Sequence, residues 1–164
     1  MRSKLLLTLV TLCLTVGMYA QMGKFFTTDN HQLSSSFVSQ VYLDHDGFLW
    51  TTTRNGINRY DGYQFRVFKK ENDADKTLAS NYVNCMIQSR GGLFYFGMYG
   101  ALQTWDGEEF HNVTLLDHEG KPNYGYATCF LERANGDLLA GSSGLGVMQI
   151  TDQTARQLGG VFIA

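Results

Sequence analysis

One feature limits what this chain can fold into more than any other: a stretch of sequence that returns after 45 residues without a gap. The stretch covers residues 44–62 and holds two short apolar runs, each followed by a turn dipeptide that ends in Gly. A third, weaker copy follows after 44 residues, and one inserted residue near Gly144 restores the spacing of 45. The matched residues are Gly47, Trp50, Ile57, Tyr60, Asp61, Gly62 and Phe65 in the first copy, Gly92, Tyr95, Leu102, Trp105, Asp106, Gly107 and Phe110 in the second, and Gly136, Leu139, Gly141, Val147 and Ile150 in the third.

A period of this length, with several short strands and a Gly turn in every copy, is typical of β-propeller blades. The sequence therefore predicts an all-β fold, a partial β-propeller of about three four-stranded blades plus an N-terminal closing strand. The expected strands are residues 37–43, 48–53, 57–60 and 65–68 in repeat one, 82–88, 93–98, 102–105 and 110–115 in repeat two, and 126–132, 138–140 and 147–150 in repeat three.

The composition agrees with such a fold and excludes one class of partner. Gly occurs 18 times and Pro once, while 13% of the residues are aromatic and 17% are charged. These values favour a turn-rich, aromatic-packed β protein over a helical bundle or a disordered chain. Because the formal net charge is −2 and no basic run occurs beyond Lys4, we expect no nucleic acid among the partners.

Residues 1–20 resemble a secretory signal peptide. Arg2 and Lys4 form a basic start, an apolar run covers residues 5–16, and cleavage is expected near Ala20. This run is too short to span a bilayer comfortably. Cys13 leaves a lipoprotein signal as an alternative, although the residue before it is bulkier than such a signal requires. The mature chain is accordingly expected to be periplasmic.

The spacing of the repeats divides the mature chain, residues 21–164, into the parts of an incomplete propeller. We expect a closing strand at about 24–28, blade one at about 33–77, blade two at about 78–120 and blade three at about 121–164. Closed propellers have about four to eight blades, so these blades are expected to be the front end of a longer protein. An open end blade would leave an apolar face of roughly 500 Å² uncovered, and the isolated chain is therefore expected to be unstable or to self-associate.

Two series of residues carry a family resemblance. Residues 33–65 read L-S-S-S-F-V-S-Q-V-Y-L-D-H-D-G-F-L-W-T-T-T-R-N-G-I-N-R-Y-D-G-Y-Q-F, and residues 78–107 read L-A-S-N-Y-V-N-C-M-I-Q-S-R-G-G-L-F-Y-F-G-M-Y-G-A-L-Q-T-W-D-G. Both resemble the two-component regulator propeller repeat. The first looks like the opening blade of the periplasmic sensor region of bacterial hybrid two-component histidine kinases. Residues 51–53, all Thr, depart from the usual apolar-Gly-Thr of that repeat, and Leu139 replaces an aromatic residue in the third copy.

The resemblance implies a large extracytoplasmic sensor, commonly two seven-bladed propellers followed by a β-sandwich, a membrane helix and a kinase module. In such proteins the ectodomain often detects glycan breakdown products. The implied partners are an oligosaccharide or another small ligand and the remainder of the sensor ectodomain, in a dimer anchored in the inner membrane. No residue of this chain matches the kinase, phosphoacceptor or membrane parts, so those parts are not carried over.

Two groups of residues invite a search for metal or thiol chemistry. Residues 44–47, D-H-D-G, look like the start of a calcium loop, but the further oxygen ligands are missing and only the Gly persists in the other copies. A turn that needs a positive φ is the better interpretation. Cys85 and Cys129 occupy matching inner-strand positions, and we expect two small buried residues there and no disulfide, because radiating blades seldom bring equivalent residues close enough. We expect neither a metal site nor a cofactor.

The aromatic residues divide into two groups. Those that repeat in register are expected to pack between blades; they are Trp50, Tyr60, Tyr95 and Trp105. Those without equivalents lie in loops that propeller topology places on one face, where ligands usually dock. An exposed ring flanked by Arg and Asn suits the apolar face and the hydroxyl groups of a sugar. The predicted ligand-binding residues are Arg54, Asn55, Tyr99 and Tyr124.

These observations favour a binding function without catalysis. The chain is predicted to be the N-terminal fragment of an extracytoplasmic ligand-sensing propeller of a two-component signalling protein. The expected ligand is an oligosaccharide. One alternative is a fragment of a propeller-type polysaccharide lyase or hydrolase, which would need acid and base residues near the propeller axis. A secreted protein-interaction scaffold that uses the same loops is the other. No catalytic residues are predicted in this chain.

Overall fold

The computed structural model describes residues 25–29, 32–71, 76–151 and 153–158. The expected signal peptide lies outside these residues. No helix in the part of the chain that the structure describes is long and apolar enough to cross a membrane. The regular elements there are strands, namely β1 (Val38–Leu43), β2 (Leu49–Thr53), β3 (Gly56–Tyr60), β4 (Phe65–Phe68), β5 (Val83–Gln88), β6 (Phe94–Met98), β7 (Ala101–Trp105), β8 (Phe110–Leu116), β9 (Tyr126–Glu132), β10 (Leu138–Ser143), β11 (Gly146–Thr151) and β12 (Thr154–Gln157).

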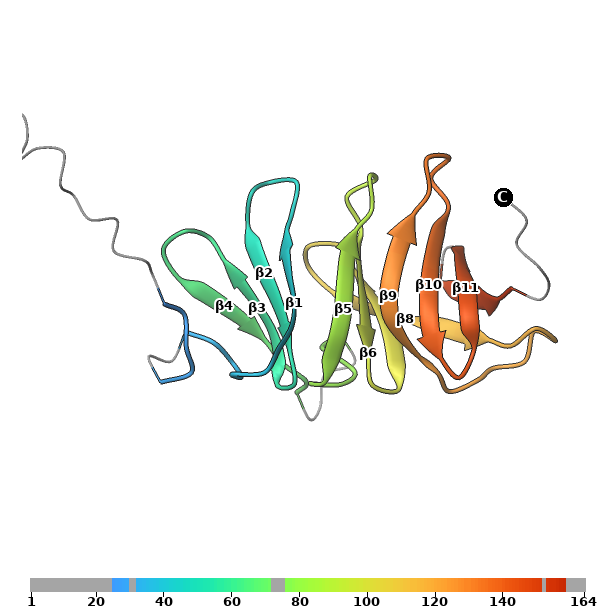
Figure 1. Cartoon of the computed structure of the whole chain (residues 1–164), viewed down its shortest axis with the longest axis horizontal. Helices are drawn as coiled ribbons and strands as arrows, with labels where there is room; N and C mark the ends of the chain where they lie inside the picture. The colour runs from blue at the N-terminus through green and yellow to red at the C-terminus, as the bar shows by residue number, and fades with distance from the viewer. Residues whose placement is uncertain (1–24, 30–31, 72–75, 152, 159–164) are drawn as a thin grey trace, which may run out of the picture.

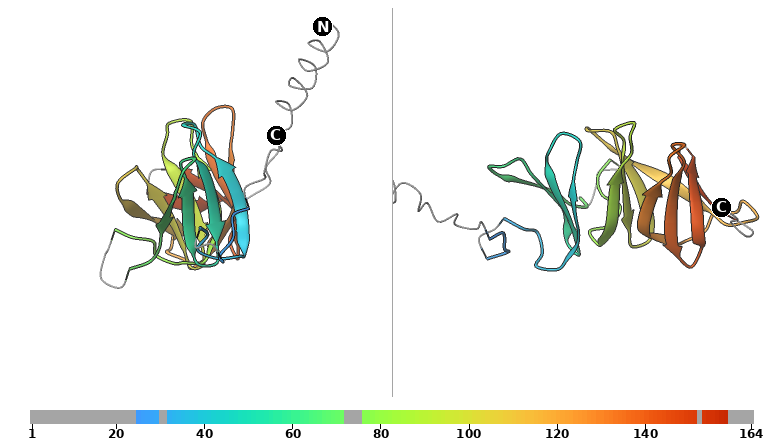
Figure 2. Two further views of the ribbon diagram at one scale, coloured as in Figure 1. Left: turned by 90° about the vertical axis from the view of Figure 1, so that its left-hand side faces the viewer. Right: turned by 45° about the horizontal axis from the view of Figure 1, so that its top comes forward.

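Each run of four strands forms one antiparallel blade, and the three blades follow one another along the long axis of the molecule (Figures 1 and 2). In every blade the first strand pairs with the second, the second with the third and the third with the fourth. The inner strands β1, β5 and β9 are neighbours in space. The expected all-β propeller with three four-stranded blades is confirmed.

Blades two and three are also joined at their outer rim. Strand β12 pairs in parallel with β8, with Thr154 opposite Thr114 and Arg156 opposite Leu116. The two blades thereby form one eight-stranded sheet in the order β5-β6-β7-β8-β12-β11-β10-β9. Because β5 and β9 also lie side by side, this sheet folds back on itself and resembles a flattened barrel (Figure 1).

The sequence predicts a fourth strand in blade three without locating it. Strand β12 covers Thr154–Gln157 and contains one apolar residue, Ala155, which is fully buried between the blades. Such a short segment shows no alternation of apolar and polar residues. Its strand conformation comes from pairing with β11 on one side and β8 on the other. Tertiary context therefore decides the structure of this segment.

The core between blades one and two is largely aromatic. Trp50 of blade one is fully buried, and its ring centroid lies 5.4 Å from that of Trp105 and 5.0 Å from that of Phe94 in blade two. The buried members of this core are Trp50, Ile57, Phe68, Leu78, Val83, Met86, Phe94, Phe96, Met98, Trp105 and Phe110. The expectation that Trp50 and Trp105 pack between blades is confirmed.

The core between blades two and three uses the opposite face of the blade two sheet, because side chains alternate along each strand. It is built mainly from aliphatic side chains, with Tyr95 packed at its edge. Its buried members are Cys85, Leu102, Val113, Leu115, Ala127, Leu138, Ala140, Leu145, Met148, Ile150 and Ala155. Blade two thus presents one face to blade one and the other to blade three.

The turn between the first two strands of each blade follows the Gly pattern of the repeat. Gly47, Gly92 and Gly136 all have positive φ, at 84°, 91° and 92°. Residues with a Cβ rarely adopt this conformation, which explains why Gly persists at this place in every copy. Asp44 is buried and accepts hydrogen bonds from the backbone N–H groups of residues 46 and 48 and from the Trp50 indole at 2.7 Å. The interpretation of this motif as a turn is confirmed.

The residue inserted in the third copy lies in a hairpin loop. Two residues separate Thr53 from Gly56, the last pair of the β2–β3 hairpin, whereas three separate Ser142 from Gly146 in the β10–β11 hairpin. This places the insertion next to Gly144, as the spacing of the repeats predicts.

The N-terminal segment differs from the expected closing strand at about 24–28. Its described residues, 25–28, form no strand. Phe26 instead packs against the outer face of blade one, with its ring centroid 4.8 Å from Tyr60 and 5.0 Å from Phe65. A closing strand takes its conformation from backbone pairing with a neighbouring strand, and no β-strand pairs with these residues among those that the structure describes.

The two matching cysteines differ in exposure, which corrects the expectation that both are buried. Cys85 of β5 is buried at the contact with blade three, and burial raises the pKa of its thiol to about 12. Cys129 of β9 is exposed, because it lies on the equivalent face of blade three, which no described element covers. Both thiols are free. The prediction that they form no disulfide is confirmed.

Candidate functional site

One edge of the molecule gathers the loops that the sequence singles out. The starts of β1, β5 and β9 and the hairpins that join the second and third strand of each blade lie along the lower edge of Figure 1. A register shift follows close behind the start of each of these inner strands, at Val38/Gln40 in blade one and Val83/Cys85 in blade two. Such β-bulges redirect the side chains beside them.

Backbone hydrogen bonds fix the same pair of positions in blades one and two. The N–H of Arg54 in the β2–β3 hairpin donates to the carbonyl of Phe37 at 3.3 Å. The N–H of Tyr99 in the β6–β7 hairpin donates to the carbonyl of Tyr82 at 2.9 Å. The side chain at the hairpin tip is therefore held next to the aromatic residue that precedes the inner strand of its own blade.

Side-chain contacts then connect one blade to the next. The guanidinium carbon of Arg54 lies 3.6 Å from the ring centroid of Phe37 and 5.4 Å from that of Tyr82, and its Nε donates to the Tyr82 hydroxyl at 3.1 Å. The Tyr82 and Tyr99 rings are 6.4 Å apart, and Tyr99 is 5.6 Å from Tyr126 of blade three. We call these five residues, Phe37, Arg54, Tyr82, Tyr99 and Tyr126, the aromatic strip.

The aromatic strip is accessible to solvent and carries a single positive charge. Phe37 is 48% exposed and Tyr99 is 66% exposed, which is unusual for large rings that contact one another. Every residue within two sequence positions of a strip residue is uncharged. The strip therefore offers ring faces, phenol hydroxyls and one guanidinium.

The four residues predicted to bind ligand do not all lie in the strip. Arg54 and Tyr99 belong to it and are linked through Tyr82. Asn55 turns away, since its side-chain amide donates to the carbonyl of Ser34 at 2.9 Å and thereby holds the segment before β1. Tyr124 is 97% exposed in the connection to blade three, and no ring contact joins it to the strip among the described residues.

The sequence reasoning missed three members of the strip, Phe37, Tyr82 and Tyr126. Each occupies the last position before or the first position of an inner strand, and their spacings of 45 and 44 residues match the repeat. An aromatic residue that repeats in register was interpreted as core packing. The missed signal is its place at the strand start, where the side chain emerges at the edge of the sheet and remains partly exposed.

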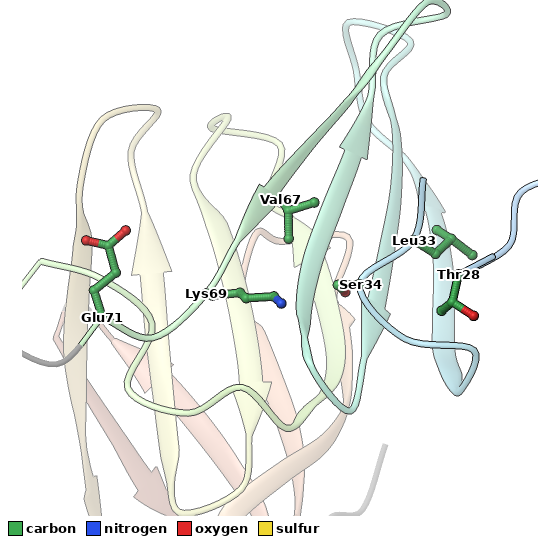
Figure 3. A pocket seen from close by; sticks show the side chains of 6 residues that line it. All are labelled: Thr28, Leu33, Ser34, Val67, Lys69 and Glu71. Atoms are coloured by element: carbon green, nitrogen blue, oxygen red, sulfur yellow. The ribbon is translucent and has the colours of Figure 1, made fainter. Parts of the chain in front are cut away.

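Two hollows are lined by residues outside the strip. One, of about 480 Å³, lies on the outer face of blade one between the N-terminal segment and β4, and Figure 3 shows Glu71 lying on the far side from Thr28 and Leu33. The other, of about 450 Å³, opens between blades one and two at the opposite edge and is lined by residues that include His45, Arg59 and Asp106. Backbone N–H groups and His111 bond to Asp106 and hold the pKa of its carboxyl well below the usual range. Neither hollow contains a group of three or more His, Cys, Asp or Glu side chains arranged to hold a metal ion, as far as the described residues show.

Comparison with known proteins gives one relative in sequence. No family model matches the chain. Histidine kinase P4 of Formosa agariphila is 34% identical over 70 residues, which make up 41% of this chain. The matched chain spans only 5% of that protein's length.

Solved structures show a similar fold. The extracellular domain of BT4673 from B. thetaiotaomicron, described as a one component system in one structure and as a hybrid two component system in another, has a TM-score of 0.59 in both, at 16% and 17% identity. The likeness covers 73% and 76% of this chain and 18% and 19% of that domain. Virginiamycin B lyase from Staphylococcus aureus has a TM-score of 0.51 at 16% identity, over 71% of this chain and 39% of the lyase. The expected likeness to extracytoplasmic domains of two-component proteins is confirmed at the level of the fold.

Proposed function

We propose that this chain forms the first blades of an extracytoplasmic ligand-sensing propeller in a two-component signalling protein, and that it binds an oligosaccharide on the aromatic strip. The fold shared with extracellular domains of two-component systems supports the sensor role. The observation that carries the site is the strip itself, which crosses both blade boundaries and stays exposed. Sugars present apolar ring faces and hydroxyl groups, and tyrosine rings complement both.

The position of the strip suggests how binding is transmitted. Two of the contacts between blades at this edge are made by side chains, Arg54 to Tyr82 and Tyr99 to Tyr126. A ligand laid across these contacts touches more than one blade at once. It would therefore favour the blade arrangement that it fits best, and the remainder of the sensor would respond to that preference.

The proposal is tested by binding of short oligosaccharides to the chain, measured by isothermal titration calorimetry. Tyr99→Ala is expected to weaken binding about tenfold, because a stacked ring and its buried area are lost. Tyr63→Ala is the matched control, since Tyr63 is 94% exposed but lies in the β3–β4 turn, away from the strip. Equal losses in the two variants, or no binding by the unaltered chain, would contradict the proposal.

The same assay separates binding from catalysis. A polysaccharide lyase or hydrolase would shorten the oligosaccharide during incubation, and a sensor would leave it intact. Mass spectrometry of the recovered sugar therefore decides between the proposed sensor and the enzyme alternative.

A further inference from the structure

The charge pattern of the aromatic strip points to a narrower class of ligand. Arg54 is the charged member of the strip, and its neighbours in sequence on either side, as well as those of the other strip residues, are uncharged. The guanidinium group of arginine is positively charged and donates hydrogen bonds without accepting any. Arg54 therefore gives the strip a positive charge, and no acidic side chain forms an ion pair with it among the residues that the structure describes.

The guanidinium of Arg54 is held in place by contacts that leave part of its hydrogen-bonding capacity unused. One face stacks on Phe37 at 3.6 Å, and Nε donates to the Tyr82 hydroxyl at 3.1 Å. Neither Nη group bonds to any residue in the described parts of the chain, and Arg54 forms no ion pair there. The remaining donors form a planar fork that matches the two oxygens of a carboxylate or a sulfate.

A second arginine that stacks on a ring is placed differently. Arg59 also stacks on a ring, with its guanidinium carbon 4.5 Å from the Phe48 centroid, but it lines the hollow at the opposite edge. Asp44, Asp46 and Asp106 line the same hollow. A positive charge without acidic neighbours is thus a property of the strip and not of every stacked arginine in the chain.

We infer that the oligosaccharide bound by the strip carries an anionic group, a uronate carboxylate or a sulfate ester, and that Arg54 binds it. This inference rests on the proposed function, because it specifies the ligand of the same site. The rings of Tyr82 and Tyr99 stack on the sugar, and the Arg54 fork binds the anion at the blade one end of the strip. Arg54 is then the residue that distinguishes acidic from neutral sugars.

Three probes of equal length test the inference by calorimetry on the whole chain: neutral cellotetraose, tetragalacturonate and a sulfated carrageenan tetrasaccharide. At least one acidic probe is expected to bind about tenfold more tightly than cellotetraose, and that preference should shrink at high salt. If tetragalacturonate binds tightly, the anionic group that the strip recognises is a carboxylate. If the carrageenan fragment binds tightly, that group is a sulfate. Arg54→Gln is expected to abolish the preference for the acidic probe.

Two further variants control for charge and for folding. Arg59→Gln removes the same charge at the opposite edge and should retain the preference. Arg54→Lys keeps the charge but loses the planar fork, so this variant should retain only part of the preference for the acidic probe. Circular dichroism melting verifies that each variant is folded. Equal affinity for acidic and neutral probes, or an unchanged preference in Arg54→Gln, would overturn the inference but leave the proposed function standing. Binding of none of the three probes would overturn both.

Discussion

At the scale of single residues, Thr52 and Gly97 occupy equivalent positions in blades one and two. Each pairs with a residue of the inner strand of its own blade and lies on the face that packs against the next blade. A Cβ at Gly97 would lie 2.6 Å from the Ala127 carbonyl oxygen and 2.7 Å from Cys85 Sγ, so blades two and three approach too closely there for any side chain. Thr52 is accommodated between blades one and two, where it is fully buried. Its hydroxyl has no hydrogen-bond partner within the described residues.

The buried hydroxyl of Thr52 leads to a stability prediction. Thr52→Val keeps the shape of the side chain and removes the unpaired polar atom, so we expect the free energy of unfolding to rise by about 1 kcal/mol. Thr53→Val is the matched comparison. Thr53 is equally buried, but its hydroxyl donates to the Gly56 carbonyl at 2.8 Å and accepts from the N–H of Asn55 at 3.0 Å.

Thr53→Val should lower the free energy of unfolding by about 1–3 kcal/mol, because its partners lose their bonds. Urea denaturation followed by tryptophan fluorescence measures both variants. The prediction is wrong if Thr52→Val destabilises the chain as much as Thr53→Val does.

At the scale of elements, β1 and β5 are joined by side chains of one strand bonded to the backbone of the other. The Gln40 amide accepts from the N–H of Met86 at 2.7 Å and donates to its carbonyl at 3.2 Å. The Tyr42 hydroxyl accepts from the N–H of Gln88 at 3.1 Å. These bonds satisfy backbone groups on the free edge of β5, which would otherwise remain open to other strands.

Removing this connection should loosen β5 specifically. Gln40→Met is similar in size but cannot bond to Met86, and we expect a loss of about 1–2 kcal/mol in the free energy of unfolding. Hydrogen exchange of the Met86 amide should become faster, whereas exchange at Leu102 in the interior of blade two should change only with global stability. Unchanged protection of Met86 would show that the Gln40 amide does not stabilise this edge.

Sequence patterns were most reliable for elements whose neighbours lie in the same blade. The Gly spacing and the apolar runs predict most of the strands within one or two residues, because each hairpin is specified by its own turn residues. Strand β12 was not located, since its pairing with β8 comes from another blade and leaves no periodicity in Thr154–Gln157. For the candidate site, Arg54 and Tyr99 were found from their loops. Phe37, Tyr82 and Tyr126 were not, because a repeated aromatic residue has the same pattern in a core and at an exposed strand start.

At the scale of the whole molecule, both end blades expose faces whose equivalents elsewhere are buried. Val41 is 61% exposed on blade one, but Met86, at the same place in blade two, is buried against blade one. Leu131 is 60% exposed on blade three, where its equivalent Ile87 packs into the core between blades two and three. The exposed face of blade three that carries Leu131 therefore matches the exposed face of blade one that carries Val41, because faces equivalent to these two pack together between successive blades.

This complementarity predicts head-to-tail association of the chain. Val41→Lys or Leu131→Lys should each weaken association about tenfold or more, because a charge would have to be buried in the contact. Sedimentation equilibrium at several concentrations measures the effect.

The two single variants can also be mixed. In a head-to-tail contact, a Val41→Lys chain still offers an unaltered blade three face and a Leu131→Lys chain an unaltered blade one face, so the mixture should form dimers that neither variant forms alone. A symmetric contact between identical faces would not be restored in this way. A chain that stays monomeric at high concentration would contradict the prediction altogether.

The parallel pairing of β12 with β8 has a consequence for how the chain folds. Every other pair of adjacent strands described here joins neighbours in sequence and can form as a hairpin while the rest is still unstructured. The contact of Thr154 with Thr114 closes a loop of about 40 residues, and contacts between such distant positions form slowly because the loop must first be ordered. The outer rim of blades two and three is therefore expected to form later than the hairpins within each blade.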